Sequence, residues 1–135
     1  MDAKASILVV DDEEVVRRSY ARILGEMDCD AQAAADGEQA LQAMAQRSFD
    51  VVLLDLRMPG AHGMDVLKTI KERWPASEVV VITGYPTFES ARIALRLGAC
   101  DYLAKPADPD DLMDAARGAI RRKKWELKAE AVPVH

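Results

Sequence analysis

Cysteine and histidine are scarce in this chain, and each shortage excludes a class of site. The 135 residues include two cysteines, Cys29 and Cys100, which are too few and too far apart in sequence for a disulfide framework. We expect both thiols to be reduced and buried, with no role in metal binding. The two histidines, His62 in a loop and His135 at the end, form no pattern that resembles a Ser-His-Asp site.

Long apolar runs and an excess of positive charge are also missing. No run approaches the roughly 20 apolar residues that cross a bilayer, and the opening MDAKASILVV lacks the order of a signal peptide. The net charge of −5 argues against nucleic-acid binding by this domain. With 50% hydrophobic and 30% charged residues, the sequence predicts one ordinary cytoplasmic domain that contacts neither membrane nor nucleic acid directly.

Short apolar runs alternate with helical patterns along the chain. Strands are predicted at 6–10, 29–35, 50–56, 78–83 and 101–105. Helices are predicted at about 13–27, from 63 to 74 and from 109 past 120. A further helix runs from an Asp36 cap to about 47, and another opens at Pro86 and stops at Gly98, a C-terminal glycine. Five such units predict an α/β fold, in which right-handed crossovers place helices on both faces of a parallel sheet.

Chemically reactive side chains stand where the predicted strands end. The apolar run VVLL ends in Asp55, the first strand ends in Asp11 and Asp12, the fourth in Thr83 and the fifth in Lys105. Ligands of open α/β sheets bind beyond the carboxyl ends of the strands. We therefore expect three carboxylates, one hydroxyl and one ammonium to converge at one edge of the sheet.

This combination suits phosphoryl transfer to Asp55. Three clustered carboxylates repel one another, and Mg²⁺, which prefers oxygen ligands and keeps several waters, relieves that repulsion. With the metal on one phosphoryl oxygen, Lys105 and Thr83 could each take another. The sequence offers Asp55 as the nucleophile, which would become an aspartyl phosphate.

Four motifs, ILVVDDE, VVLLDLRMPGAHG, VVVITGYP and GACDYLAKP, stand in this order along the chain. Together they resemble the receiver domain of bacterial two-component response regulators, of the chemotaxis-receiver type, over about residues 5–120. The resemblance implies a flavodoxin-like (βα)5 three-layer sandwich whose five-stranded parallel sheet has the order 2-1-3-4-5. The chain would divide into a receiver domain, residues 1–124, and a helical extension or tail, residues 125–135.

Site roles follow from the resemblance, position by position. Asp55 would be the phosphoacceptor and a metal ligand. Asp12 would bind Mg²⁺ directly, Asp11 through water, and Arg57 through its backbone carbonyl, so that its side chain need not be acidic.

The resemblance also implies a switch. Lys105 would pair with the phosphoryl group and precede a cis bond to Pro106. Thr83 would donate to the phosphoryl group, and Tyr102 would rotate as Thr83 moves. The surface formed by the fourth helix, the fifth strand and the fifth helix would then change.

A receiver domain is a signalling module, with its own phosphorylation and slow dephosphorylation as its only catalysis. The resemblance implies a sensor histidine kinase as phosphodonor and an output protein or domain as target, and it leaves open a phosphorylation-dependent homodimer. No output domain follows residue 120, so the chain is either a single-domain regulator or a receiver cut from a longer protein.

Each residue also has a purely structural reading. Asp11 and Asp12 could cap a helix, Thr83 could cap a turn, Lys105 could be solvated and Tyr102 could be core. At the level of the whole chain, a scaffold that acts without phosphorylation is one alternative. A phosphatase of the haloacid-dehalogenase type is another, but that class needs an acid two residues after the nucleophile, where Arg57 stands, and a cap domain.

Overall fold

Five strands and five helices alternate in the computed structural model, which describes the backbone of residues 4–57 and 62–131 and the side chains up to residue 124. The strands are β1 (Ser6–Val10), β2 (Asp30–Ala34), β3 (Val51–Leu54), β4 (Glu78–Thr83) and β5 (Asp101–Ala104). The helices are α1 (Glu14–Glu26), α2 (Gly37–Gln46), α3 (Gly63–Arg73), α4 (Phe88–Arg96) and α5 (Pro109–Ala131).

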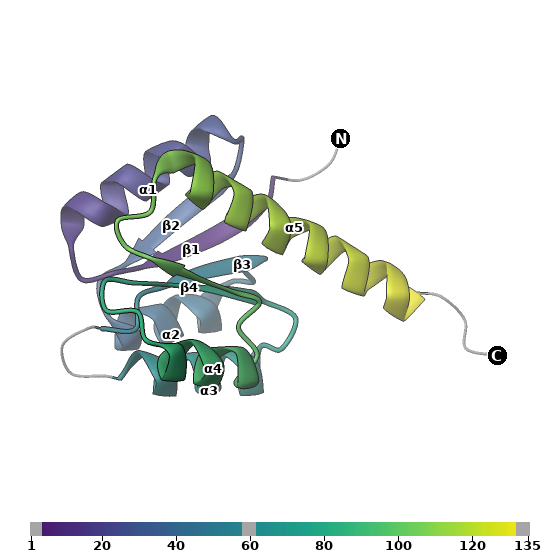
Figure 1. Cartoon of the computed structure of the whole chain (residues 1–135). Helices are drawn as coiled ribbons and strands as arrows, with labels where there is room; N and C mark the ends of the chain where they lie inside the picture. Colours follow the sequence, from purple (N-terminus) through teal and green to yellow (C-terminus); the bar gives the residue numbers. More distant parts are fainter. Residues whose placement is uncertain (1–3, 58–61, 132–135) are drawn as a thin grey trace.

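All five strands are parallel, in the order β2-β1-β3-β4-β5. Helices α1 and α5 cover one face of the sheet, and α2, α3 and α4 cover the other (Figure 1). The predicted flavodoxin-like three-layer sandwich is therefore confirmed. Among the residues described, no helix is both long enough and apolar enough to span a membrane.

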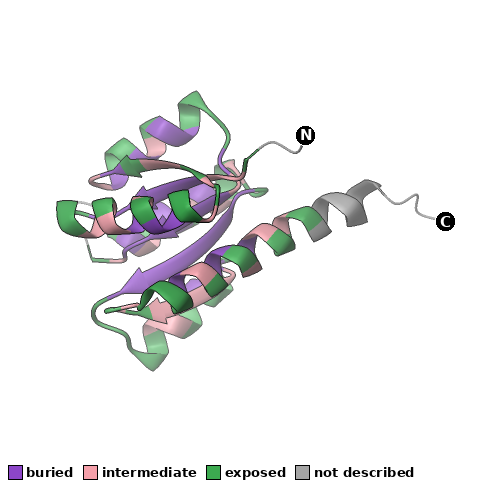
Figure 2. Ribbon diagram, turned by 90° about the horizontal axis from the view of Figure 1, so that it is seen from above, coloured by how far each residue is buried: buried purple, intermediate pink, exposed green. Residues whose placement is uncertain are grey.

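The two central strands, β3 and β4, are buried along their whole length. Successive side chains point to opposite faces, so Val52 and Leu54 pack under α2 and α3, whereas Val51 and Leu53 pack under α1 and α5. In Figure 2 the inner strands are coloured as buried, the edge strands are mostly intermediate or exposed, and the helices show buried stripes on otherwise exposed surfaces. Burial on both faces explains why these strands read as continuous apolar runs.

Two helix starts show how the caps set boundaries. Asp36 caps α2 as predicted, because its side chain accepts from the Gln39 N–H (2.8 Å). Helix α4 was predicted to begin at Pro86 but begins at Phe88, because Thr87 is its N-cap. At the other end of α4, Gly98 has φ +108°, which confirms the predicted C-terminal glycine.

The start of β4 is tied to both helical layers. Lys71 of α3 donates to the carbonyls of Pro75 and Ser77, both at 2.9 Å. Lys123 of α5 donates to the carbonyl of Ala76 (2.6 Å), and Arg122 donates to the buried carboxylate of Glu78 (3.2 Å). From there α5 continues past the end of the sheet (Figure 1).

The two cysteines are free thiols. Both are half-buried rather than buried, because each lies next to an end of an edge strand of the sheet. Burial nevertheless raises the pKa of the Cys100 thiol to about 11, so it stays protonated at neutral pH.

Candidate functional site

The ends of β1 and β3 place two aspartates side by side. Val10 and Leu54 are aligned in the sheet, and each is followed by an aspartate. The N–H of Asp55 donates to the Val10 carbonyl (3.0 Å), and that of Asp11 donates to the Ala34 carbonyl (3.1 Å). Both residues thus extend the sheet by one bond before the chain turns away. Their side chains remain buried, 2% exposed for Asp11 and 5% for Asp55.

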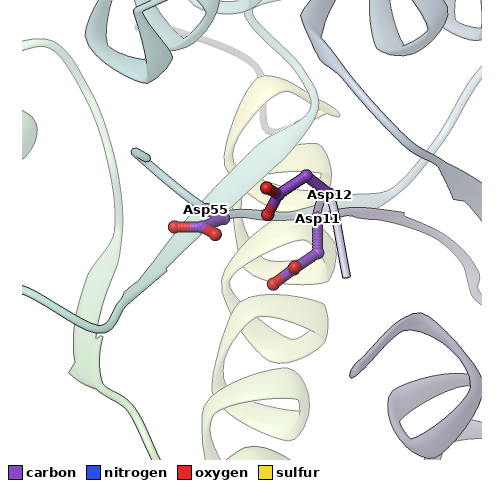
Figure 3. Close-up of side chains that lie close together, drawn as sticks. All are labelled: Asp11, Asp12 and Asp55. Atoms are coloured by element: carbon purple, nitrogen blue, oxygen red, sulfur yellow. The ribbon is translucent and has the colours of Figure 1, made fainter. Parts of the chain in front are cut away.

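Asp12 completes a cluster of three acids. Asp11, Asp12 and Asp55 each offer a carboxylate oxygen, and these oxygens all lie within 4.8 Å of one another (Figure 3). Asp12 is exposed whereas the other two are buried. A set made only of carboxylate oxygens fits a hard divalent cation such as Mg²⁺.

Lys105 faces the cluster from the end of β5. Its Nζ lies 2.6 Å from Oδ2 of Asp11 and 3.1 Å from Oδ2 of Asp55. The Lys105 N–H donates to the Thr83 carbonyl (2.8 Å), and the bond to Pro106 is cis, as predicted. One ammonium facing three carboxylates leaves the cluster with surplus negative charge.

Burial dominates the electrostatics of the site. It raises the pKa of the Asp55 carboxyl, although hydrogen bonds from the Arg57 N–H (3.0 Å) and from Lys105 oppose the rise. For Lys105 burial alone would lower the pKa, but its hydrogen bonds to Asp11 and Asp55 outweigh burial and raise it. Lys105 therefore stays charged, whereas the ionised form of Asp55 is costly and would gain from an added cation.

Thr83 and Tyr102 lie differently with respect to the cluster. Thr83, 1% exposed, ends β4 and accepts through Oγ1 from the Tyr85 N–H (3.2 Å). The residue of β5 that is aligned with Thr83 is Ala104. Tyr102 is half-buried, and its hydroxyl reaches Ser90 of α4 rather than the acids. The structure thus gathers the three aspartates and Lys105, and it places the two predicted switch residues on the adjoining strands.

Some residues to which the sequence analysis gave no role also border the site. A pocket of about 500 Å³ opens over the cluster, and Glu13, His62 and Tyr85 help to line it. The guanidinium of Arg57 stacks over the Tyr85 ring, 3.8 Å from its centroid. Glu13 and Tyr85 follow the site residues Asp11 and Thr83 by two positions, which is the signal that could have found them. The proposed role of the Arg57 carbonyl stays a prediction.

The loop after Asp55 is packed closely against α3. Gly63 begins α3 against the backbone of Leu56, where a Cβ would lie 2.4 Å from Leu56 Cα. Only glycine fits there. Arg57 and His62 pair as an antiparallel bridge. The Pro59-Gly60 part of the quoted motif lies outside the described residues.

The fold and the cluster of acids define a class of signalling domain. The chain matches the response regulator receiver domain over residues 7–117, and it belongs to this family. The resemblance inferred from the four motifs is thus confirmed.

The individual relatives are named as response regulators or as transcriptional regulators. The chain is 35% identical over 132 residues to response regulator protein PilR of Pseudomonas aeruginosa, covering 98% of this chain and 29% of PilR. It is 36% identical over 114 residues to the DNA-binding transcriptional regulator NtrC of Escherichia coli, covering 84% of this chain and 24% of NtrC. The chain therefore spans less than a third of the length of these relatives.

Solved structures agree with this assignment. A CheY-like receiver domain protein from Methanospirillum hungatei superposes with a TM-score of 0.89 at 26% identity, over 92% of this chain and 99% of that one. The receiver domain of NtrX from Brucella abortus gives a TM-score of 0.81 at 37% identity, over 85% and 98% of the two chains.

Proposed function

We propose that this receiver domain accepts a phosphoryl group on Asp55 in a Mg²⁺-dependent reaction. The single observation that supports this most is the buried Asp55 carboxylate, held between two further aspartates and the Lys105 ammonium. Asp11, Asp12, Asp55 and the Arg57 backbone carbonyl would hold the metal. When bound, Mg²⁺ neutralises part of the charge on the phosphoryl oxygens.

The transfer is a displacement at phosphorus. An Oδ of Asp55 forms a bond to phosphorus while the P–N bond of a phosphohistidine on a sensor kinase breaks, and its electron pair returns to the imidazole nitrogen. Lys105 neutralises charge on one oxygen and the Thr83 hydroxyl donates to another. Attack of water on phosphorus later releases phosphate and restores the Asp55 carboxylate.

The phosphoryl group would act through Thr83 and Tyr102 on the surface of α4, β5 and α5. Tyr102 lies on β5 itself, and Thr83 ends the neighbouring strand β4, where the segment that leads into α4 begins. PilR is named a response regulator and NtrC a DNA-binding transcriptional regulator. We therefore propose that the target is an output domain or protein that regulates transcription. A phosphorylation-dependent homodimer would use the same surface, with no direct nucleic-acid contact by this domain.

Intact-mass measurement with a small acyl phosphate tests the acceptor. We expect one added phosphoryl group in the presence of Mg²⁺, and none after chelation or in Asp55→Asn. Asp65→Asn is a suitable control, since Asp65 is an exposed acid on the first turn of α3. Unchanged phosphorylation of Asp55→Asn, or of the wild type without divalent metal, would contradict the proposal. A scaffold that acts without phosphate would show no added mass at all.

A further inference from the structure

The N-terminus of α4 contains a hydroxyl network that includes Tyr102. The Ser90 N–H donates to Oγ1 of Thr87 (2.9 Å), and the Thr87 N–H donates to Oγ of Ser90 (3.3 Å), which forms a reciprocal capping box. The Tyr102 hydroxyl lies 2.5 Å from Ser90 Oγ and also accepts from the Thr87 N–H (3.4 Å). A side chain of β5 therefore takes part in the cap of α4. We call Thr87, Ser90 and Tyr102 the hydroxyl latch.

The protons of the latch can all be assigned. Ser90 Oγ also donates to the Thr87 carbonyl (3.1 Å), which uses its only proton. Tyr102 must then donate its hydroxyl proton to Ser90 Oγ, and the Thr87 N–H is shared between the two hydroxyl oxygens. In this arrangement every donor has an acceptor. Ser90 is the residue common to the helix cap and to Tyr102.

A short segment connects the latch to the acidic site. Thr83 Oγ1 accepts from the Tyr85 N–H, Pro86 follows with its fixed φ, and Thr87 comes next. If the Thr83 hydroxyl turns toward a phosphoryl group, the Tyr85 N–H loses its acceptor. The change then passes through a stiff residue directly into the cap of α4.

We propose that Ser90 is a positioning residue that holds Tyr102 at the cap of α4 and so opposes the phosphorylation-induced switch. This rests on the proposed function of Asp55. The latch occurs together with a Thr83 Oγ1 that is engaged by the Tyr85 N–H and with direct contact of Lys105 with the unmodified Asp55 carboxylate. We therefore assign the latch to the unphosphorylated form. Loss of the latch should therefore favour the phosphoryl-bound form, because a ligand gains from whatever destabilises the competing state.

Beryllofluoride, a phosphoryl mimic, measures this coupling at equilibrium in the presence of Mg²⁺. By calorimetry we expect Ser90→Ala to bind it roughly two- to ten-fold more tightly than the wild type, the factor that one hydrogen bond gives. Tyr102→Phe should have a similar effect, and the double variant should bind no more tightly than either single variant, since both remove the same bond. Ser90→Thr, which keeps the hydroxyl, should bind like the wild type.

Thr69→Ala is the matched control, because the Thr69 hydroxyl donates to the Asp65 carbonyl within α3 (2.9 Å) and lies outside the latch. It should leave beryllofluoride binding unchanged. Unchanged or weakened binding by Ser90→Ala, or additive effects in the double variant, would overturn the proposal. If Ser90 had only a structural role, Ser90→Ala would lower the melting temperature without tightening beryllofluoride binding. That result would also overturn the proposal.

Failure of the proposed function gives a different result. A wild type that binds no beryllofluoride contradicts the acceptor site and, with it, the coupling. Hydrogen exchange in the unmodified chain still decides whether the latch exists. Exchange of the first-turn amides of α4 should rise in Ser90→Ala and in Tyr102→Phe, with no further rise in the double variant.

Discussion

At the scale of single residues, Asp55 is a carboxylate that the fold holds at a cost. Burial raises its pKa above the ordinary value of 3.8. Between the ordinary and the raised pKa, the folded chain binds more protons than the unfolded chain, so stability falls as the pH rises through this window. Above the window the loss is complete, which means that ionised Asp55 destabilises the metal-free protein at neutral pH.

Asp55→Asn should therefore raise the melting temperature at pH 7 in the presence of a chelator. The gain should shrink as the pH is lowered toward 3.8, where the wild-type carboxyl takes up its proton. Thermal unfolding followed by circular dichroism at several pH values measures this. Asp65→Asn, which removes the charge of an exposed acid on α3, is the control for the loss of one negative charge. A lower melting temperature for Asp55→Asn at pH 7 would show that its bond to Lys105 outweighs burial.

The sequence predicted single residues well only where the fold itself brings them together. Asp11, Asp55 and Lys105 converge because parallel strands end at one edge, a consequence of topology. The stack of Arg57 on Tyr85 and the bond from Tyr102 to Ser90 depend on how particular loops run. Hydrophobic periodicity carries no information about loop conformation, so neither contact could be predicted.

At the scale of elements, all ten predicted helices and strands are present, because the helices carry a one-sided hydrophobic pattern whereas the central strands are short continuous apolar runs. Their ends are less predictable. Pro86 resembles a first helical residue, but the reciprocal bonds of Thr87 and Ser90 start α4 two residues later. A cap is decided by side-chain geometry, and several residues near a boundary can supply it.

Helix α5 is held in part by a buried carboxylate at the start of β4. Glu78 is 2% exposed, and Arg122 donates to its carboxylate. We expect Arg122→Ala to lower the free energy of unfolding by about 1–3 kcal/mol, toward the lower end because Arg122 is largely exposed. Urea denaturation measures the change, with the neighbouring exposed Arg121→Ala as control. Equal stability of the two variants would show that this bond contributes nothing.

At the scale of the whole molecule, the described side chains of α5, which run up to residue 124, already include those that anchor it on the sheet. Its buried side chains are Leu112, Ala115, Ala116 and Ala119, and its anchors are Arg122 and Lys123. A chain that ends at Lys124 should therefore keep the same denaturation midpoint and the same phosphorylation of Asp55. The division into 1–124 and 125–135, and a signalling role for the second part, stay predictions.

Sedimentation of the 1–124 chain with and without beryllofluoride separates the two readings of the extension. If association that depends on beryllofluoride is present in the full chain and absent in the shorter one, the extension couples the switch to assembly. A clear fall in the denaturation midpoint of the shorter chain would instead show that residues 125–135 belong to the folded domain.

The lysines that meet at residues 75–77 have a mechanical consequence. Lys71 and Lys123 come from helices on opposite faces of the sheet and donate to successive carbonyls of one loop. This loop lies at the end of the sheet opposite the acids and connects the two helical layers there. We expect the layers to tilt about this loop more easily than they slide along the strands, because sliding would break the hydrogen bonds of Lys71 and Lys123. We therefore expect a small displacement at the acidic edge to appear as rotation of α5 rather than as sliding of the helical layers.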